Sequence, residues 1–85
     1  MTAPSRGIAY TITIRCQIEN RPGMLGTIAT AIGESGGDIG AIDIVRVDRN
    51  HLTRDITVRV QDEIHGDRIV RRINAVPGVV VTNVS

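Results

Sequence analysis

The sequence predicts an α+β domain whose elements follow the order β-α-β-β-α-β. Apolar residues alternate with polar ones in four segments, as in half-buried strands, and recur at three-to-four spacing in two others, as in amphipathic helices. The chain has 85 residues, which suits one small domain. We expect strands at 8–19, 39–47, 52–61 and 79–84, and helices at 24–35 and 62–76.

The first strand has the clearest pattern. Every second residue from Ile8 to Ile18 is apolar or aromatic, and most residues between them are polar. This alternation indicates one buried face and one face that is wet or meets a polar partner. Residues 1–7 are interpreted as a flexible leader, so the domain itself is expected to span 8–85.

A turn at Asn20–Gly23 separates this strand from the first helix. Pro22 fixes its own φ and biases Arg21 away from the helical region. Gly23 permits a tight turn and the close approach of a ligand. The helical pattern begins at Met24, and Gly36 or Gly37 is expected to end it in the left-handed conformation.

The second strand has two less distinct faces. One face carries Ile39, Ala41, Asp43, Val45 and Val47, and the other carries Ile42, Ile44 and Arg46. Apolar residues on both faces indicate cover on both sides, the second cover coming from another subunit. A hairpin turn at 48–51 leads into the third strand, where Arg54 interrupts the inward row of Leu52, Ile56, Val58 and Val60 and is assigned to a frayed start.

The second helix has a predicted N-cap at Asp62 and a buried stripe of Ile69, Val70, Ile73 and Val76. Gly66 costs roughly 1 kcal/mol relative to alanine, so we expect the first turn to fray. Pro77-Gly78 ends the helix before the last strand.

These elements predict a ferredoxin-like βαββαβ sandwich, with a four-stranded antiparallel sheet and two helices on one face. Right-handed crossovers give the strand order 4-1-3-2, which leaves the second and fourth strands at the edges. The second strand is then available to pair with a copy of itself, which predicts a homodimer.

Composition excludes several function classes. The net charge is +1, so there is no basic surface that would indicate nucleic acid or an anionic membrane as a partner. One cysteine excludes an intramolecular disulfide, and Cys16 is expected to be an inert core residue. His51 and His65 share no ligand spacing, so neither a metal nor a cofactor is expected. With no signal peptide and no bilayer-spanning run, we expect a soluble cytoplasmic protein.

The fold alone does not define the function. The first loop lacks the cysteine pair of a metal-transport module, and the open sheet face lacks the aromatic residues of an RNA-recognition module. A small acylphosphatase-like hydrolase would need a phosphate cradle with an arginine and an asparagine. Arg21 and Asn20 could supply that pair, so this hydrolase stays as a weak alternative.

The elements Asn20-Arg21-Pro22-Gly23-Met24-Leu25 and Gly36-Gly37-Asp38-Ile39 resemble the ACT domain, a family of small regulatory modules attached to metabolic enzymes. The resemblance covers about Tyr10 to Ser85. Asn20–Val47, Arg54–Val58 and Pro77–Val79 are similar to the ACT domain that precedes the catalytic domain of some bacterial NAD-dependent malic enzymes. It implies a non-catalytic regulatory chain, followed by a catalytic domain in the full-length protein.

The resemblance also implies a ligand site between two subunits. The effector, an amino acid or related metabolite, would lie between the first loop of one subunit and the second strand of its neighbour. The implied binding residues are Asn20, Pro22, Gly23, Met24, Leu25, Asp38, Ile39 and Gly40. Backbone N–H groups of 23–25 would hold a carboxylate, and Asp38 would pair with an ammonium group.

Other readings of these residues stay open. Asn20 and Pro22-Gly23 also make a good helix entry, and Asp38 is equally a turn residue. Asp43 is interpreted as an exposed edge residue, and Arg68, Arg71 and Arg72 as a solvated helix face. The module could also act only in oligomerisation, with no ligand.

Overall fold

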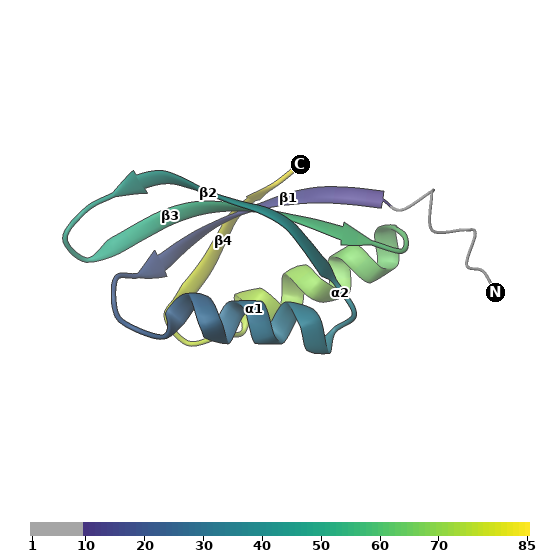
Figure 1. Ribbon diagram of the computed structural model, residues 1–85, viewed down its shortest axis with the longest axis horizontal. Coiled ribbons are helices and arrows are strands. Elements are labelled where there is room, and N and C mark those ends of the chain that lie inside the picture. The colour runs from purple at the N-terminus through teal and green to yellow at the C-terminus, as the bar shows by residue number, and fades with distance from the viewer. Residues whose placement is uncertain (1–9) are drawn as a thin grey trace.

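The computed structural model describes residues 10–85 and has two layers, a sheet and a pair of helices on one of its faces (Figure 1). The elements are β1 (Tyr10–Glu19), α1 (Met24–Glu34), β2 (Asp38–Val47), β3 (His51–Val60), α2 (Glu63–Asn74) and β4 (Val79–Val84). The predicted leader 1–7 and the predicted strand start at Ile8 lie outside the described residues. Neither helix in 10–85 has the length and apolar character needed to cross a membrane.

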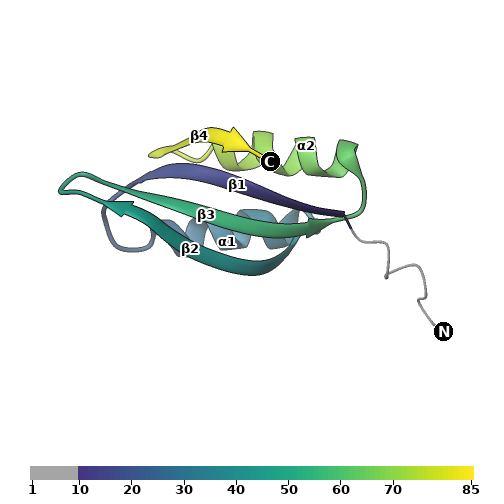
Figure 2. The ribbon, with the colours of Figure 1, turned by 90° about the horizontal axis from the view of Figure 1, so that it is seen from above.

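The sheet order is β2-β3-β1-β4, which is the predicted order 4-1-3-2 read from the other edge. The antiparallel βαββαβ sandwich is therefore confirmed, with β2 and β4 as its edge strands. β1 pairs with β3 from Tyr10 to Glu19, whereas β4 pairs only with the second half of β1, from Ile14 to Ile18. The two central strands thus form the long axis of the sheet (Figure 2).

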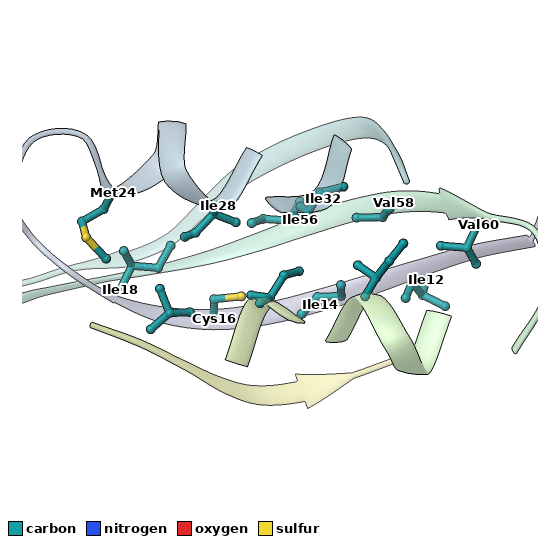
Figure 3. Packing of buried hydrophobic residues seen from close by; sticks show 13 residues of the cluster. Ile12, Ile14, Cys16, Ile18, Met24, Ile28, Ile32, Ile56, Val58 and Val60 are labelled. Atoms are coloured by element: carbon teal, nitrogen blue, oxygen red, sulfur yellow. The ribbon is translucent and has the colours of Figure 1, made fainter. Parts of the chain in front are cut away.

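The core is aliphatic and lies between the sheet and the helices (Figure 3). Ile12, Ile14, Cys16 and Ile18 of the predicted inward row of β1 are buried, and Ile14 and Cys16 have no exposed surface. Tyr10, predicted to face inward, is 46% exposed at the start of the strand, and Ile8 lies outside the described residues. The main core residues are Ile12, Ile14, Cys16, Ile18, Met24, Ile28, Ile32, Ile56, Val58, Val60, Ile69, Ile73 and Val79. The prediction that Cys16 is a core residue is confirmed, and burial raises the pKa of its thiol to about 11.

The predicted division of β2 into two faces was wrong, because the strand is irregular at two places. Its register against β3 shifts between Ile39 and Ala41 and again between Ile44 and Arg46. At each shift β2 has one residue without a partner in β3, and the side chains that follow point to the opposite face from the one that simple alternation predicts. Ile39 and Ile42, which simple alternation puts on opposite faces, therefore both pack against the core.

Two further expectations needed correction. Arg54 is not at a frayed strand start, since β3 begins at His51 and Arg54 is paired with Cys16 on one side and Ile44 on the other. Gly66 does not mark a frayed turn. It is buried, and a Cβ there would lie 3.4 Å from Cδ1 of Ile12, so the missing side chain lets α2 approach β1 closely.

The β2–β3 hairpin reaches past both helices (Figures 1 and 2). Ile44 and Val47, near the far end of β2, are 58% and 59% exposed, and Val45 is 45% exposed. Ile44 pairs with Arg54, which lies two residues from buried Ile56, so Ile44 lies on the helix side of the sheet, where it is still exposed. The edge strand therefore ends in an uncovered apolar surface, which we call the hairpin arm (Ile44, Val45 and Val47).

Candidate functional site

The loop between β1 and α1 is tied to the tip of the β2–β3 hairpin. The backbone N–H of Asn20 donates to the carbonyl of Asn50 over 2.9 Å, and Nδ2 of Asn20 donates to the carbonyl of Asp48 over 3.3 Å. Asn20 therefore has a structural role, but its bonds are to the hairpin tip and not to the helix entry that was expected. Arg21 pairs instead with Glu19, with Nε 2.7 Å from Oε1. Arg21 and Asn20 bind different partners and form no shared phosphate cradle.

Gly23 is the N-cap of α1 and has a φ of 86°, in the left-handed region that glycine adopts without strain. No side chain caps this helix. The carbonyl of Gly23 accepts the backbone N–H of Thr27 at 3.0 Å, so the first N–H groups of α1 keep the open hydrogen-bonding positions of a helix start. With the positive end of the helix dipole, they form an arrangement suited to a carboxylate.

The other predicted site residues of this loop differ in how far their side chains are exposed. Pro22 is exposed and Leu25 is half-buried, whereas the side chain of Met24 is only 5% exposed and belongs to the core. Met24 can therefore contribute its backbone to a ligand but not its side chain. The sequence could not separate these two uses, because a methionine at a helix start suits both.

The second glycine turn ends α1 as predicted, and Gly36 rather than Gly37 has the positive φ, at 83°. The N–H of Gly36 donates to the carbonyl of Gly33 at 3.0 Å, and the N–H of Gly37 donates to that of Ile32 at 2.9 Å. This pair of bonds is the Schellman motif. A Cβ on Gly37 would lie 2.8 Å from Cδ1 of Ile69, so this turn packs directly on α2.

Three predicted site residues follow this turn at the start of β2. Asp38 is exposed, and its Oδ2 lies 3.6 Å from Nη1 of Arg59. Gly40 is exposed at the first irregularity of β2. Ile39 packs against the core, so Asp38 and Gly40 are the more accessible members of this group.

The two halves of the predicted site lie at opposite ends of α1 (Figure 1). The helix has 11 residues, which corresponds to about 16 Å along its axis. Within one chain, the loop at Asn20–Leu25 and the strand start at Asp38–Gly40 therefore do not converge on one small molecule. A site built from both groups would therefore need a second subunit.

A groove of about 510 Å³ runs along the outer side of the two helices. It is lined by Gly23, Gly26, Thr27, Thr30, Ala31, Glu34, Arg72 and Val76. At one end, Nη2 of Arg72 lies 2.7 Å from Oε1 of Glu34. Arg72 was expected on a solvated helix face, and its partner was missed because the pairing depends on how two distant helices pack.

His65 was also missed as a structural residue. It is 4% exposed, and both ring nitrogens lie within hydrogen-bond distance of backbone groups. Within residues 10–85, no three His, Cys, Asp or Glu side chains gather into a possible metal site. No local pattern indicates this role of His65, since its partner Ser35 is 30 residues away.

The open face of the sheet carries paired charges. Nε of Arg15 in β1 lies 2.8 Å from Oδ1 of Asp55 in β3, and Nη2 lies 3.0 Å from Oδ2. The hydrogen bond and charge of Arg15 lower the pKa of the Asp55 carboxyl below its ordinary value. This pair stabilises the register of two strands and lies outside the predicted site.

A family profile and two related proteins all match most of this chain. A profile of the ACT domain family matches residues 7–82. The chain is 42% identical over 79 residues to the NAD-dependent malic enzyme of Geobacillus stearothermophilus, covering 93% of this chain and 16% of that enzyme. It is 40% identical over 63 residues to NAD-dependent malic enzyme 1 of Bacillus subtilis (strain 168), covering 74% of this chain and 14% of that enzyme.

The fold also matches solved structures. The crystal structure of the ACT domain from GTP pyrophosphokinase of Chlorobium tepidum has a TM-score of 0.70 at 19% identity, covering 91% of this chain and 96% of that one. The solution structure of the same domain has a TM-score of 0.67, covering 91% of this chain and 84% of that one. The ACT fold is regulatory and non-catalytic, in agreement with the prediction that this chain is not an enzyme. With a family match over nearly its whole length and the βαββαβ topology, the chain belongs to the ACT domain family.

Proposed function

We propose that this domain is a metabolite sensor that works as a homodimer. Two subunits pair through the β2 edges, and an amino acid or related central metabolite binds between the Asn20–Leu25 loop of one subunit and the start of β2 of the other. In a longer cytoplasmic protein of the malic-enzyme type, the bound effector controls a catalytic domain that follows the ACT domain. The similarity to two malic enzymes supports this assignment.

One observation carries the shared site. Asn20 ties the first loop to the hairpin tip at Asp48–Asn50, and this tip directly follows the last residue of β2, Val47. If two β2 strands pair antiparallel about a twofold axis, the end of one strand lies beside the start of the other. The first loop of one subunit then approaches Asp38 of the partner subunit, where one chain alone keeps these groups apart.

The apolar hairpin arm supports the same pairing. Ile44, Val45 and Val47 belong to the hairpin that reaches past the helices, and they are 58%, 45% and 59% exposed. Fully burying one such side chain contributes about 1.5–3 kcal/mol. A partner subunit beside β2 would bury part of this surface, and it would also satisfy the free backbone groups of a ten-residue edge strand.

The chemistry of the two halves suits a zwitterionic effector. The uncapped start of α1 at Gly23 offers N–H donors to a carboxylate, and exposed Asp38 offers a carboxylate to an ammonium group. Because the effector contacts both subunits, it binds the dimer more tightly than the monomer. Its binding then shifts the population toward the dimer.

A role in assembly alone is the second candidate. It is favoured by the side chain of Asn20, which is already bonded to Asp48, and by that of Met24, which is buried. Thermal unfolding against the common L-amino acids, malate, pyruvate and nucleotides separates the two functions. Under the sensor proposal one ligand class raises the midpoint; a flat panel with a midpoint that still rises with protein concentration supports assembly alone.

A further inference from the structure

His65 holds two backbone groups from different parts of the chain. Its Nδ1 lies 2.9 Å from the backbone N of Gln61, and its Nε2 lies 2.7 Å from the carbonyl oxygen of Ser35. A backbone N–H only donates and a carbonyl only accepts, so Nδ1 is the acceptor and Nε2 carries the proton. The contacts therefore select the neutral Nε2–H tautomer.

The first turn of α2 fixes the orientation of this ring. Oδ1 of Asp62, the N-cap, accepts the backbone N–H of His65 at 2.8 Å, while the His65 ring accepts the N–H of Gln61. This is a reciprocal arrangement like a capping box, with histidine in the place of the usual glutamate or glutamine. The ring is thus held by its own helix before it reaches Ser35.

The far side of the ring contacts the second glycine turn. Ser35 is the C-cap of α1, where a carbonyl has no partner further along the helix. A Cβ on Gly36 would lie 3.3 Å from Nε2 of His65, and Gly37 is packed against Ile69, also from α2. The turn is therefore held against α2 by the bond from His65, by a longer bond of 3.5 Å from Nη1 of Arg72 to Oγ of Ser35, and by close packing. The next residue is Asp38.

We propose that His65 is a positioning residue, which fixes the Ser35–Gly37 turn and so sets the direction in which Asp38 and Gly40 enter the effector site. This inference rests on the proposed function, because it assigns to His65 the placement of one half of that site. It also makes His65 one of the contacts between that half and α2, beside the packing of Gly37 on Ile69. Movement of the turn on effector binding is then transmitted to the start of α2.

The test is His65→Gln, with His51→Gln as the matched control. In glutamine the acceptor oxygen and the donor nitrogen share one terminal carbon, so we expect it to keep at most one of the bonds to Gln61 and Ser35. The His51 side chain makes no hydrogen bond within residues 10–85. Amide hydrogen exchange is measured at Gly36 and Gly37, the donors of the turn, and at Thr27, which bonds to Gly23 at the other end of α1.

In His65→Gln we expect exchange at Gly36 and Gly37 to accelerate at least about fivefold relative to Thr27, as the loss of one hydrogen bond implies. We expect no such difference in His51→Gln. Equal acceleration at both ends of α1, or unchanged exchange at the turn, would overturn the proposal. If His65→Gln does not fold, nitrogen NMR of the wild-type His65 ring replaces the exchange measurement. A protonated Nε2 coupled to the Ser35 carbonyl supports the hydrogen bond that holds the turn, and a mixture of tautomers contradicts it.

The effector arm of the test uses each common L-amino acid and L-malate as probes. A probe that binds the wild type should bind His65→Gln at least about fivefold more weakly, with the dimer dissociation constant of the free protein unchanged. Equal affinity in both proteins would refute the positioning role while leaving the sensor proposal intact. If no probe binds the wild type, the proposed function and the effector role of His65 fail together. The exchange data still show whether His65 holds the Ser35–Gly37 turn.

Discussion

The side-chain amide of Asn20 donates to the carbonyl of Asp48 over 3.3 Å, and this bond joins the entry of α1 to the tip of the β2–β3 hairpin. The two residues are 28 positions apart, and their elements belong to different layers of the fold. The loop that offers N–H groups to a ligand is thereby fixed relative to the edge strand proposed for dimerisation. In the proposed dimer, this bond would link ligand binding to subunit pairing.

Asn20→Ala tests this link. Removing the side-chain bond leaves the backbone bond from Asn20 to Asn50, so we expect a loss of about 0.5–1.5 kcal/mol in the free energy of unfolding. Asn83→Ala, an exposed asparagine in β4, is the control and should stay within about 0.5 kcal/mol of the wild type. Urea unfolding measures both. Equal stability of Asn20→Ala and the wild type would mean that the bond contributes nothing.

Gly23→Leu tests the helix entry. No heavy atom lies within 4 Å of a Cβ at Gly23, so the cost comes from the φ of 86° and amounts to about 1–2 kcal/mol. Gly33→Ala is the matched control, because a Cβ there meets no atom and its φ is not positive. It should stabilise the domain by about 0.5–1 kcal/mol. Under the sensor proposal Gly23→Leu also abolishes the effector response while the dimer persists.

Ile44→Asp tests the proposed dimer edge. A charge on the exposed hairpin arm should weaken dimerisation by at least about tenfold, because burying it against a partner is costly. Ile64→Asp is the control: Ile64 is 74% exposed in the first turn of α2 and lies outside β2. Sedimentation equilibrium gives the dissociation constants. A dimer weakened only by Ile64→Asp would place the interface elsewhere.

The ion pair of Asp55 with Arg15 should make part of the free energy of unfolding depend on pH in the acid range. The hydrogen bond from Arg15 lowers the pKa of Asp55 in the folded state below its ordinary value of 3.8. A lowered folded pKa gives stability that is present above pH 3.8 and is lost as the pH falls through the folded value. The stability difference between the wild type and Asp55→Asn should therefore shrink as the pH falls below 3.8. A difference that does not change with pH would contradict the pairing.

Local patterns predicted most of the fold. The alternation of β1, the helical spacing after Gly23 and the N-cap at Asp62 each follow from neighbouring residues, and the sheet order follows from the handedness of the crossovers. The irregularities of β2 escaped prediction because a shift at Gly40 depends on how β2 pairs with β3. Arg54 was misassigned for a similar reason.

The candidate site was predictable only in part. The turns at Gly23 and Gly36 are local, and they were found. The contact of the His65 ring with Ser35 and the ion pair of Glu34 with Arg72 each join residues at least 30 positions apart, and no spacing rule predicts them. The homodimer was predicted from the edge position and the apolar faces of β2, whereas the ligand site between two subunits was inferred from the resemblance. Both stay predictions, because their contacts lie between two chains.

Mixing two variants tests the shared site most directly. Gly23→Leu damages one half of the site and Asp38→Ala the other, so each dimer alone should lose its effector-induced rise in the unfolding midpoint. In an equal mixture after subunit exchange, about half of the dimers are hybrids with one intact site, and about a quarter of the wild-type sites should return. Recovered effector binding near that level, measured by calorimetry, is the predicted result. A mixture that binds no more effector than either variant would contradict a site built from two subunits.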